Sequence, residues 1–330
     1  MKVITDERCT GYSSRGHPER PARVAKTAEK LKQQTELQIE WVTPAQATDE
    51  VILRAHSPEH IARLRIPHDF DGDTPYYEGI ENYARASVDA ALLALKFARA
   101  GEVSFSLMRP PGHHATRDQA MGFCFLNNVA IAALEAKATG AKRVAVFDFD
   151  VHHGNGTQVV CMDDDRFGFI STHQWGIYPG TGWINDAPHA KGRLVNVPLH
   201  EFAGDGTFAR VADEIFKPIV ESFRPQMLLI SAGFDAHWND PITSLGLSTR
   251  GYYEISKKLV ALANEHCGGK IVFVLEGGYD PHNVANGAMA VFDALTHSPL
   301  RKDAGDPSPY PDSDHESRIH DILKWHGIAQ

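Results

Sequence analysis

Two patterns of hydrophobic positions alternate along the chain. Short runs rich in valine, isoleucine and phenylalanine predict buried strands, and longer stretches whose apolar residues recur every three or four positions predict helices. Strands are predicted at residues 3–5, 39–42, 103–108, 143–150, 167–173, 192–199, 226–231 and 270–275. Helices are predicted at residues 23–34, 56–64, 78–100, 126–138, 205–223 and 250–264, with a closing helix after residue 280. This alternation predicts an α/β fold in which helices cover both faces of a mainly parallel sheet.

No break in the pattern interrupts residues 1–297, which we expect to form a single domain. Residues 298–314 are rich in proline, aspartate and serine, and they predict a linker or a surface strap. Ser313 and Glu316 then predict a capping box at the start of a short helix with a narrow apolar stripe. We therefore expect residues 298–330 to pack either on the same domain or at an interface between copies of the chain.

The loops that follow the predicted strands are expected at one edge of the sheet, because right-handed crossovers bring the carboxyl ends of parallel strands together. They span residues 110–125, 148–158, 173–183, 233–242 and 276–280. The second of these loops reads DFDVHHGNGTQ, in which Asp148, Asp150 and His152 are two positions apart. On an extended backbone these three side chains point to the same side. Taken alone, they are either a set of metal ligands or a hydrogen-bonded polar cluster.

Other loops carry side chains that suit hydrolytic chemistry. His113 and His114 follow a Pro-Pro-Gly turn, Asp235 follows a strand, and Tyr279 follows two glycines. Each of these residues alone is more often structural, since paired histidines serve as ligands, as acid–base groups or as buried polar side chains. Together with the loop at 148–158 they supply a third oxygen ligand, an acid–base pair and a hydroxyl. A zinc ion held by Asp, His and Asp keeps an open position for water, as a hydrolase requires.

Composition narrows the functional classes. The 330 residues carry a formal charge of −9, so a basic surface for direct nucleic-acid binding is not expected, while a cationic substrate is compatible. Four cysteines without a CxxC spacing argue against a disulfide framework or a thiolate zinc site, and fit a reducing compartment. Residues 1–21 lack the apolar core of a signal peptide, and no stretch is long and apolar enough to span a membrane. We expect a cytoplasmic protein with no membrane partner.

Several motifs occur in a fixed order between residues 16 and 297. They are GHPERPARV, RPPGHH, GFCFLNN, DFDVHHGNGTQ, STHQWGIYPGTG, SAGFDAHWNDP and LEGGYD. With this set the chain resembles the zinc-dependent histone deacetylase and acetylpolyamine amidohydrolase superfamily, and most of all its class II deacetylases and their bacterial relatives. The resemblance implies an open, arginase-like α/β domain with a mainly parallel sheet of roughly eight strands.

The resemblance also implies roles for the polar residues of these loops. The implied zinc ligands are Asp150, His152 and Asp235, with ferrous iron as the alternative native metal. The implied catalytic residues are His113, His114, Tyr279, Asp148 and Asn155. The two histidines hold the nucleophilic water, with Asp148 behind His113 and Asn155 behind His114. Tyr279 hydrogen-bonds the substrate carbonyl.

Further residues are implied around a tunnel that holds an alkyl chain. They are the Gly122 carbonyl, the aromatic walls Phe123 and Tyr178, the rim residues Asp73 and Ile242, and Arg20 at an internal channel that releases acetate. A structural potassium ion is also implied, bound mostly by main-chain oxygens. Its residues are Asp148, Asp150, His152, Ser171 and Thr172.

The substrate stays open between acetylated lysine in peptides or proteins and acetylated polyamines or other small amides. Asp73 and the aliphatic Ile242 suit a peptide, because some polyamine deacylases of the superfamily carry a glutamate at the Ile242 position. The acidic loop at 67–77 is shorter than the insertion of other polyamine enzymes, although its charge attracts a polycation. His237 and Trp238 either narrow the entrance or pack against the neighbouring loop.

Asn155 differs from the aspartate that class I members carry. A neutral amide cannot stabilise an imidazolium as a carboxylate does, so we expect a lower pKa for His114. Two other classes remain as alternatives. An arginase-like enzyme with two manganese ions needs additional aspartates, in whose place stand the paired histidines and Tyr279. A non-catalytic acetyl-group binder is expected to lack one of the catalytic residues, and all are present.

Overall fold

A computed structural model describes residues 1–302, 304–305 and 307–328. The described strands form one eight-stranded sheet in the order β2-β1-β3-β8-β7-β4-β5-β6, and every neighbouring pair is parallel. They are β1 (Lys2–Ile4), β2 (Glu40–Val42), β3 (Ser104–Ser106), β4 (Val144–Asp148), β5 (Phe167–Gln174), β6 (Leu194–Leu199), β7 (Leu228–Ala232) and β8 (Ile271–Leu275). The predicted α/β fold with a parallel sheet is confirmed.

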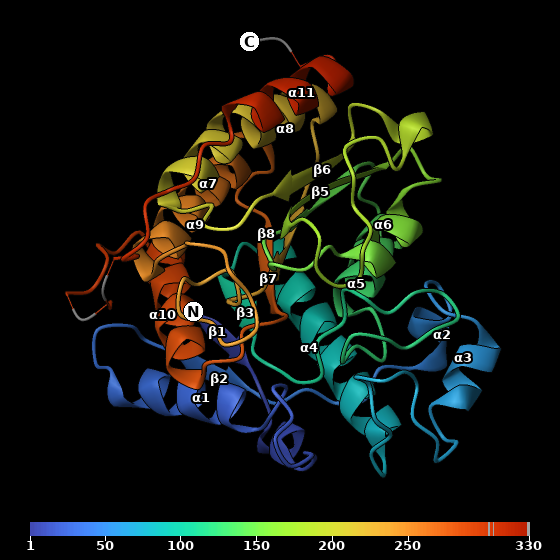
Figure 1. Ribbon diagram of the computed structural model, residues 1–330. Coiled ribbons are helices and arrows are strands. Elements are labelled where there is room, and N and C mark those ends of the chain that lie inside the picture. The colour runs from blue at the N-terminus through green and yellow to red at the C-terminus, as the bar shows by residue number, and fades with distance from the viewer. Residues whose placement is uncertain (303, 306, 329–330) are drawn as a thin grey trace.

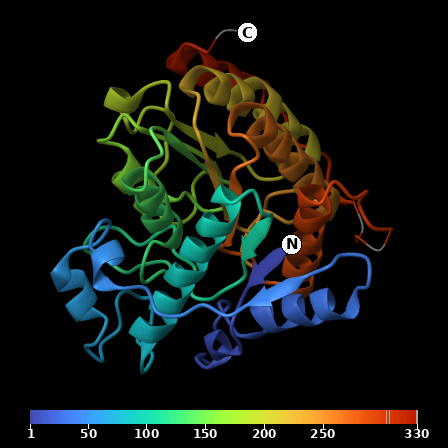
Figure 2. The ribbon, with the colours of Figure 1, turned by 180° about the vertical axis from the view of Figure 1, so that it is seen from behind.

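Helices cover both faces of the sheet, as the two opposite views show (Figure 1, Figure 2). They are α1 (Ala22–Gln33), α2 (Asp49–Ile52), α3 (Pro58–Arg63), α4 (Ile80–Arg99), α5 (Asn128–Ala138), α6 (Asn155–Cys161), α7 (Asp205–Val211), α8 (Lys217–Phe223), α9 (Thr249–His266), α10 (Pro281–Leu295) and α11 (Glu316–His326). Helix α10 packs against both α1 and α9 on one side, and α4 packs against α5 on the other. Single 3₁₀ turns lie at Glu7–Thr10 and Pro188–Ala190.

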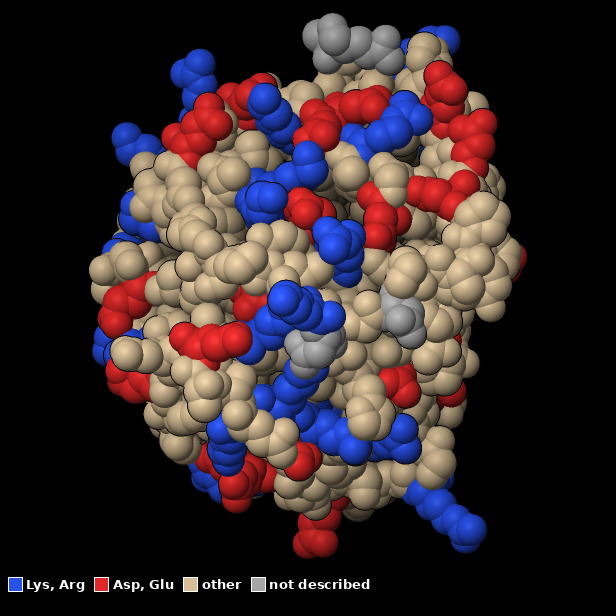
Figure 3. Space-filling model, turned by 90° about the vertical axis from the view of Figure 1, so that its left-hand side faces the viewer, with Lys and Arg blue, Asp and Glu red and all other residues tan. Residues whose placement is uncertain are grey.

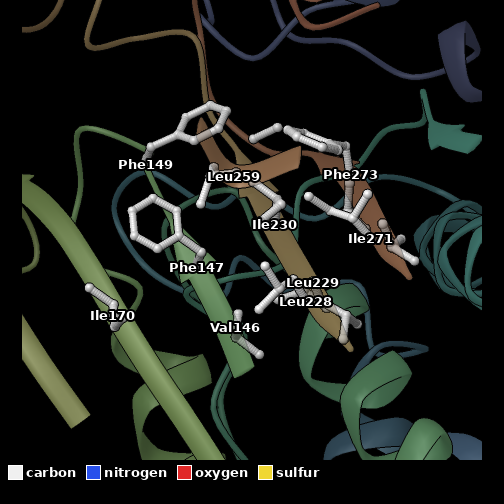
Figure 4. Packing of buried hydrophobic residues seen from close by; sticks show 14 of the residues in the cluster. Val146, Phe147, Phe149, Ile170, Leu228, Leu229, Ile230, Leu259, Ile271 and Phe273 are labelled. Carbon is white, nitrogen blue, oxygen red and sulfur yellow. The ribbon is translucent and has the colours of Figure 1, made fainter. Parts of the chain in front are cut away.

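The central strands β4, β7 and β8 are buried along their whole length. Because both faces are covered, their sequences are nearly continuous hydrophobic runs rather than alternating ones. Figure 4 shows how Val146, Ile230 and Phe273 lie together in this core. On one face the rings of Phe147 and Phe216 meet edge to face, with 3.7 Å between their centroids. This packing fixes the strand ends from which the polar loops emerge.

The helix predicted at 205–223 is confirmed in its bounds, and it contains an irregularity. The structure has α7, then a π-helical turn at Ala212–Phe216, then α8, with no break between them. Pro218 explains the irregularity, because proline has no N–H and its ring clashes with the carbonyl four residues earlier in a regular helix. In the π turn the N–H of Lys217, the residue before the proline, donates to the Ala212 carbonyl five residues earlier instead of to the carbonyl four residues earlier.

The predicted capping box at Ser313 and Glu316 is wrong. The Ser313 hydroxyl donates to the Glu201 carbonyl at 2.7 Å instead, and α11 begins without a side-chain cap. Helix α11 packs against the edge strand β6 and buries Ile319, Ile322 and Leu323 in the main core. In the segment before it, residues 303 and 306 of the predicted strap lie outside the described residues, as do 329–330.

The face that carries α1 and α10 has mixed charge, with lysine and arginine gathered near its middle and acidic residues around them (Figure 3). A groove between these helices is lined by Lys26, Lys30 and Arg301 among others. None of the candidate catalytic residues lines it. No helix of the described residues is long and apolar enough to cross a membrane.

Candidate active site at the carboxyl ends of the strands

Four neighbouring strands present the candidate side chains at one edge of the sheet. In the order β3-β8-β7-β4, these strands lead into the loops that hold the paired histidines, Tyr279, Asp235 and the DFDVHH segment. Strand β4 ends at Asp148, so Asp150 and His152 lie in the loop beyond it. The sheet therefore assembles in space what the sequence spreads over 167 positions, from residue 113 to residue 279.

Asp150, His152 and Asp235 form a buried cluster whose ligand atoms all lie within 4.8 Å of one another. Nδ1 of His152 is 3.1 Å from Oδ1 of Asp150 and 3.2 Å from Oδ2 of Asp235. Burial raises the pKa of Asp235, and the neighbouring Asp150 carboxylate raises it further. Two desolvated carboxylates side by side favour a cation between them. This donor set fits a divalent metal with three protein ligands and an open position.

Main-chain amides and glycines hold the two carboxylates in place. Gly277 N–H donates to Asp150 Oδ2 at 2.7 Å, and Val151 N–H donates to Asp235 Oδ1 at 2.9 Å. A Cβ at Gly233 would overlap Asp150, and a Cβ at Gly277 would overlap both Asp235 and Asp150. Only glycine leaves room for the backbone to approach the carboxylates this closely.

The adjacent histidines have different partners. Nδ1 of His113 is 3.0 Å from Asp148 Oδ2, and Nδ1 of His114 is 2.7 Å from Asn155 Oδ1. Burial lowers the pKa of His113, but the Asp150 and Asp148 carboxylates outweigh burial and raise it to about 10. Burial and the nearby His113 and His152 hold the pKa of His114 well below its usual range. The two rings are 4.0 Å apart between centroids, and their surroundings move their pKa values in opposite directions.

Helix α6, which the sequence did not predict, positions this pair. Asn155 is its first residue, and Thr157 N–H donates to the His113 carbonyl at 3.1 Å. A Cβ at Gly156 would overlap the main chain at Ala115, so the glycine allows the helix to pack directly on the histidine segment. Gly156 is therefore a packing position within a short helix, and Gly154, where a Cβ would overlap the Asp148 carboxylate, directly precedes it.

Tyr279 lies beside the cluster, with its ring centroid 6.4 Å from that of His152, and is 5 % exposed. Its N–H donates to Asp240 Oδ2 at 2.8 Å, and its ring meets Phe123 edge to face at 5.7 Å. The preceding Gly278 has φ +111°, a conformation that L side chains rarely adopt. This turn directs the tyrosine back over the strand ends.

The structure corrects the prediction for Arg20, which is exposed. The buried arginine is Arg23, whose Nε and Nη2 donate to the carbonyls of Gly278 and Glu276 and whose guanidinium lies 5.2 Å from the ring centroid of Tyr279. Arg23 also forms a buried ion pair with Glu19 at 3.0 Å. Helix α1 begins at Ala22, so position 23 falls on its buried stripe. That helical periodicity was the sequence signal that Arg23, rather than Arg20, is buried.

The predicted tunnel residues surround the histidine pair. The ring of Tyr178 stands edge-on to that of His114 at 5.1 Å, and Phe123 contacts His17 at 4.7 Å. Gly122 has φ +56°, and a Cβ there would lie 2.5 Å from His114 and 2.8 Å from Tyr178. These contacts place both aromatic rings next to the cluster, and the tunnel itself stays a prediction.

The acidic loop at 67–77 contacts the main chain of Gly122 and Phe123 rather than standing free in solvent. Thr74 Oγ1 accepts from Phe123 N–H at 3.0 Å, and Asp71 Oδ2 accepts from Gly122 N–H at 3.4 Å. Asp73 is exposed beside it, and its carbonyl contacts His17 Nε2 at 3.1 Å. These contacts place two carboxylates next to the aromatic walls.

On the opposite rim Ile242 is 43 % exposed. His237 is only 5 % exposed, and it pairs with Leu247 in an isolated bridge. Trp238 N–H donates to the Leu247 carbonyl at 2.9 Å. Of the two alternatives for His237 and Trp238, the main-chain pairing favours packing against the neighbouring segment.

The residues predicted to bind potassium lie where β4 and β5 end side by side. Asp148 and Ser171 are register partners, and Thr172 Oγ1 donates to the Asp148 carbonyl at 3.2 Å. The potassium site itself stays a prediction.

Glu276 was missed by the sequence analysis, although a charged residue directly after a hydrophobic strand was a usable signal. It is 1 % exposed, and its Oε2 accepts from Gly112 N–H at 2.6 Å and His113 N–H at 3.1 Å. Asp240, also missed, accepts from the N–H groups of Tyr279 and Ile242. Both acids support the main chain that carries catalytic candidates.

Comparison with known proteins agrees with this geometry. Residues 17–295 match the histone deacetylase domain. A probable deacetylase of Archaeoglobus fulgidus is 40 % identical over 290 residues, which cover 84 % of this chain and 80 % of that protein. A histone deacetylase-like amidohydrolase of Pseudomonas aeruginosa is 39 % identical over 282 residues, covering 82 % and 73 %.

A solved structure, the crystal structure of the HDA15 HD domain, superposes with a TM-score of 0.87 at 31 % sequence identity. The match covers 99 % of this chain and 96 % of that chain. The family and its relatives' names agree with a hydrolase that acts on amide bonds. The chain belongs to the histone deacetylase family.

Proposed function

We propose that the protein is a zinc-dependent amidohydrolase that removes acetyl groups from the ε-amine of lysine in peptides or proteins. The observation that carries this proposal is the buried Asp150–His152–Asp235 cluster beside two histidines whose pKa values shift in opposite directions. Zinc fits the nitrogen and oxygen donors of the cluster. Ferrous iron is the alternative native metal.

His114 is the group we assign to proton transfer. Because its pKa lies well below the usual range, the ring is neutral at physiological pH and accepts a proton from the attacking water. Asn155 Oδ1 faces Nδ1, which leaves Nε2 for the reacting groups. The same nitrogen then returns the proton to the departing amine. A bound Zn²⁺ would add Lewis acidity toward the carbonyl and lower the pKa of water.

His113 and Tyr279 stabilise charge around the reacting carbon. His113 is held by Asp148 at 3.0 Å and orients the water. Burial keeps the pKa of Tyr279 well above its usual range, so the hydroxyl is protonated and donates to the carbonyl oxygen as negative charge develops.

The approach to the site supports a linear alkylamine chain as the bound group. Phe123 and Tyr178 supply its aromatic walls, while Asp71 and Asp73 beside it suit a positively charged flank. The same carboxylates favour a second candidate, an acetylated polyamine, because a polycation gains from acids at the rim. Potassium at the β4–β5 ends, a cytoplasmic location and self-association are further parts of this proposal.

Steady-state rates on an acetyl-lysine peptide, acetylputrescine and acetylspermidine test the substrate. We expect kcat/KM to be highest for the peptide, and a preference for either polyamine would replace the first candidate with the second. Metal is tested by stripping the protein with a chelator and restoring it with Zn²⁺ or Fe²⁺. Activity that survives complete removal of metal would contradict the proposal.

A further inference from the structure

A second buried group of potential ligands lies beside the first. His113, Cys124 and Glu276 each offer one ligand atom, and these atoms lie within 4.8 Å of one another. All three residues are at most 2 % exposed. Small rotations of the side chains bring such atoms to the distances of about 2.0–2.3 Å at which zinc binds nitrogen, oxygen and sulfur.

Glu276 has a free oxygen in this group. Its Oε2 already accepts two main-chain N–H bonds, but Oε1 is buried and has no hydrogen-bond partner among the described residues. An unpaired, desolvated carboxylate oxygen is costly, and a bound cation removes that cost. The orphaned oxygen therefore points to a ligand.

The two other residues are prepared for a metal. Nδ1 of His113 faces the Asp148 carboxylate, an arrangement that leaves Nε2 as the donor and strengthens its basicity. Burial and the Glu276 carboxylate raise the pKa of the Cys124 thiol well above its usual range, so a bound cation has to displace the thiol proton. Cys124 itself is held by paired main-chain bonds to Met121, both 3.0 Å long.

We propose that His113, Cys124 and Glu276 form a second cation site, for a thiophilic divalent ion such as Zn²⁺ or Cd²⁺, that inhibits the enzyme. Binding displaces the Cys124 S–H proton and the proton on Nε2 of His113, both of which leave to solvent, and no electron is transferred. Nε2 of His113 lies 3.7 Å from Asp150 Oδ1, so this ring belongs to both clusters. A cation on that nitrogen removes His113 from the orientation of the water. The binding step is independent of the proposed substrate.

Cadmium titration of the zinc-loaded protein tests the site directly. We expect one additional Cd²⁺ to bind with an ultraviolet thiolate-to-cadmium absorption band, and deacetylase turnover to fall as the band grows. In Cys124→Ser the band should disappear, and inhibition should need at least about tenfold more Cd²⁺. In Glu276→Gln the band should persist, with affinity weakened about 10–100-fold.

Cys267→Ser is the matched control, since this buried thiol donates to the Pro225 carbonyl and serine can make the same bond. It should bind and respond like the wild type. A band that persists in Cys124→Ser, or inhibition that is equal in Cys124→Ser and wild type, would overturn the proposal. If the protein lacks deacetylase activity, the band and the stoichiometry still decide whether the site exists. Circular dichroism checks that each variant is folded.

Discussion

The floor and the rim of the site are built in different ways. The floor consists of the cluster Asp150, His152 and Asp235, the histidine pair and Tyr279, and its carboxylates and rings are fixed by neighbouring strands and by glycine contacts. The rim consists of the loop at 67–77 and of residues 237–242, where Ile242 and Asp73 are exposed. We infer that the strand ends determine the reaction and that the exposed loops determine which amine reaches it. If this division is correct, changes in the floor alter kcat and changes in the rim alter KM.

The largest expected loss comes from the floor, in Tyr279→Phe. Removing one preorganised donor to a developing oxyanion lowers kcat by about 10²–10³-fold. KM and bound zinc should stay near their wild-type values, measured by steady-state kinetics and metal analysis. Tyr253→Phe removes a hydroxyl that donates to the Ser298 carbonyl and serves as control. Near-normal turnover of zinc-loaded Tyr279→Phe would show that Tyr279 does not belong to the floor.

The substitutions Arg23→Ala and Arg20→Ala compare how much a buried and an exposed arginine contribute to the free energy of unfolding. The change leaves Glu19 with one fewer buried partner and frees two carbonyls, so the free energy of unfolding should fall by about 3 kcal/mol. Arg20→Ala removes the same charge from an exposed position and should change it by no more than about 0.5 kcal/mol. Urea unfolding measures both. Equal effects would contradict the assignment of the buried role to Arg23.

Asn155→Asp should move the pH profile without abolishing activity. A carboxylate beside Nδ1 favours the imidazolium, so the pKa of His114 rises. Because the neutral ring is the base, the acidic limb of the kcat/KM profile shifts to higher pH. An exposed asparagine, changed in Asn264→Asp, should leave the limb in place. An unmoved limb in Asn155→Asp would mean that His114 is not the base.

The smallest effect is expected at the rim, in Asp71→Asn. The asparagine keeps an acceptor for Gly122 N–H, but the charge is lost. KM for a cationic substrate should rise by up to about fivefold, kcat should stay constant, and added salt should reduce the difference. A uniform loss in kcat would show that this loop belongs to the floor.

The floor was largely predictable from the sequence, because buried parallel strands leave continuous hydrophobic runs and polar residues then collect at their ends. Most of the motifs that identified the family are these polar segments at the strand ends. The rim and the supports were harder to predict. The contact between the loop at 67–77 and Gly122 depends on chain segments that only the fold brings together. Composition alone favoured a solvated loop there.

Particular errors show which physical effect prevailed. Arg20 was chosen over Arg23 because motif position was weighed above the helical stripe. Helix α6 was missed because residues 148–158 were interpreted as a strand-end loop, whereas a Cβ at Gly154 or Gly156 would overlap a neighbour. In both cases tertiary packing decided a question that local propensity left open.

The glycines under the metal cluster also set a limit on sequence drift. At Gly233 and Gly277 the space of a single methyl group is already occupied by ligand carboxylates. Any other side chain there displaces a ligand, so no sequence of individually tolerated steps leads away from glycine at either position. Rim positions such as Ile242 have no such restriction. New substrate preferences can therefore arise at the rim by single substitutions, while the chemistry beneath stays fixed.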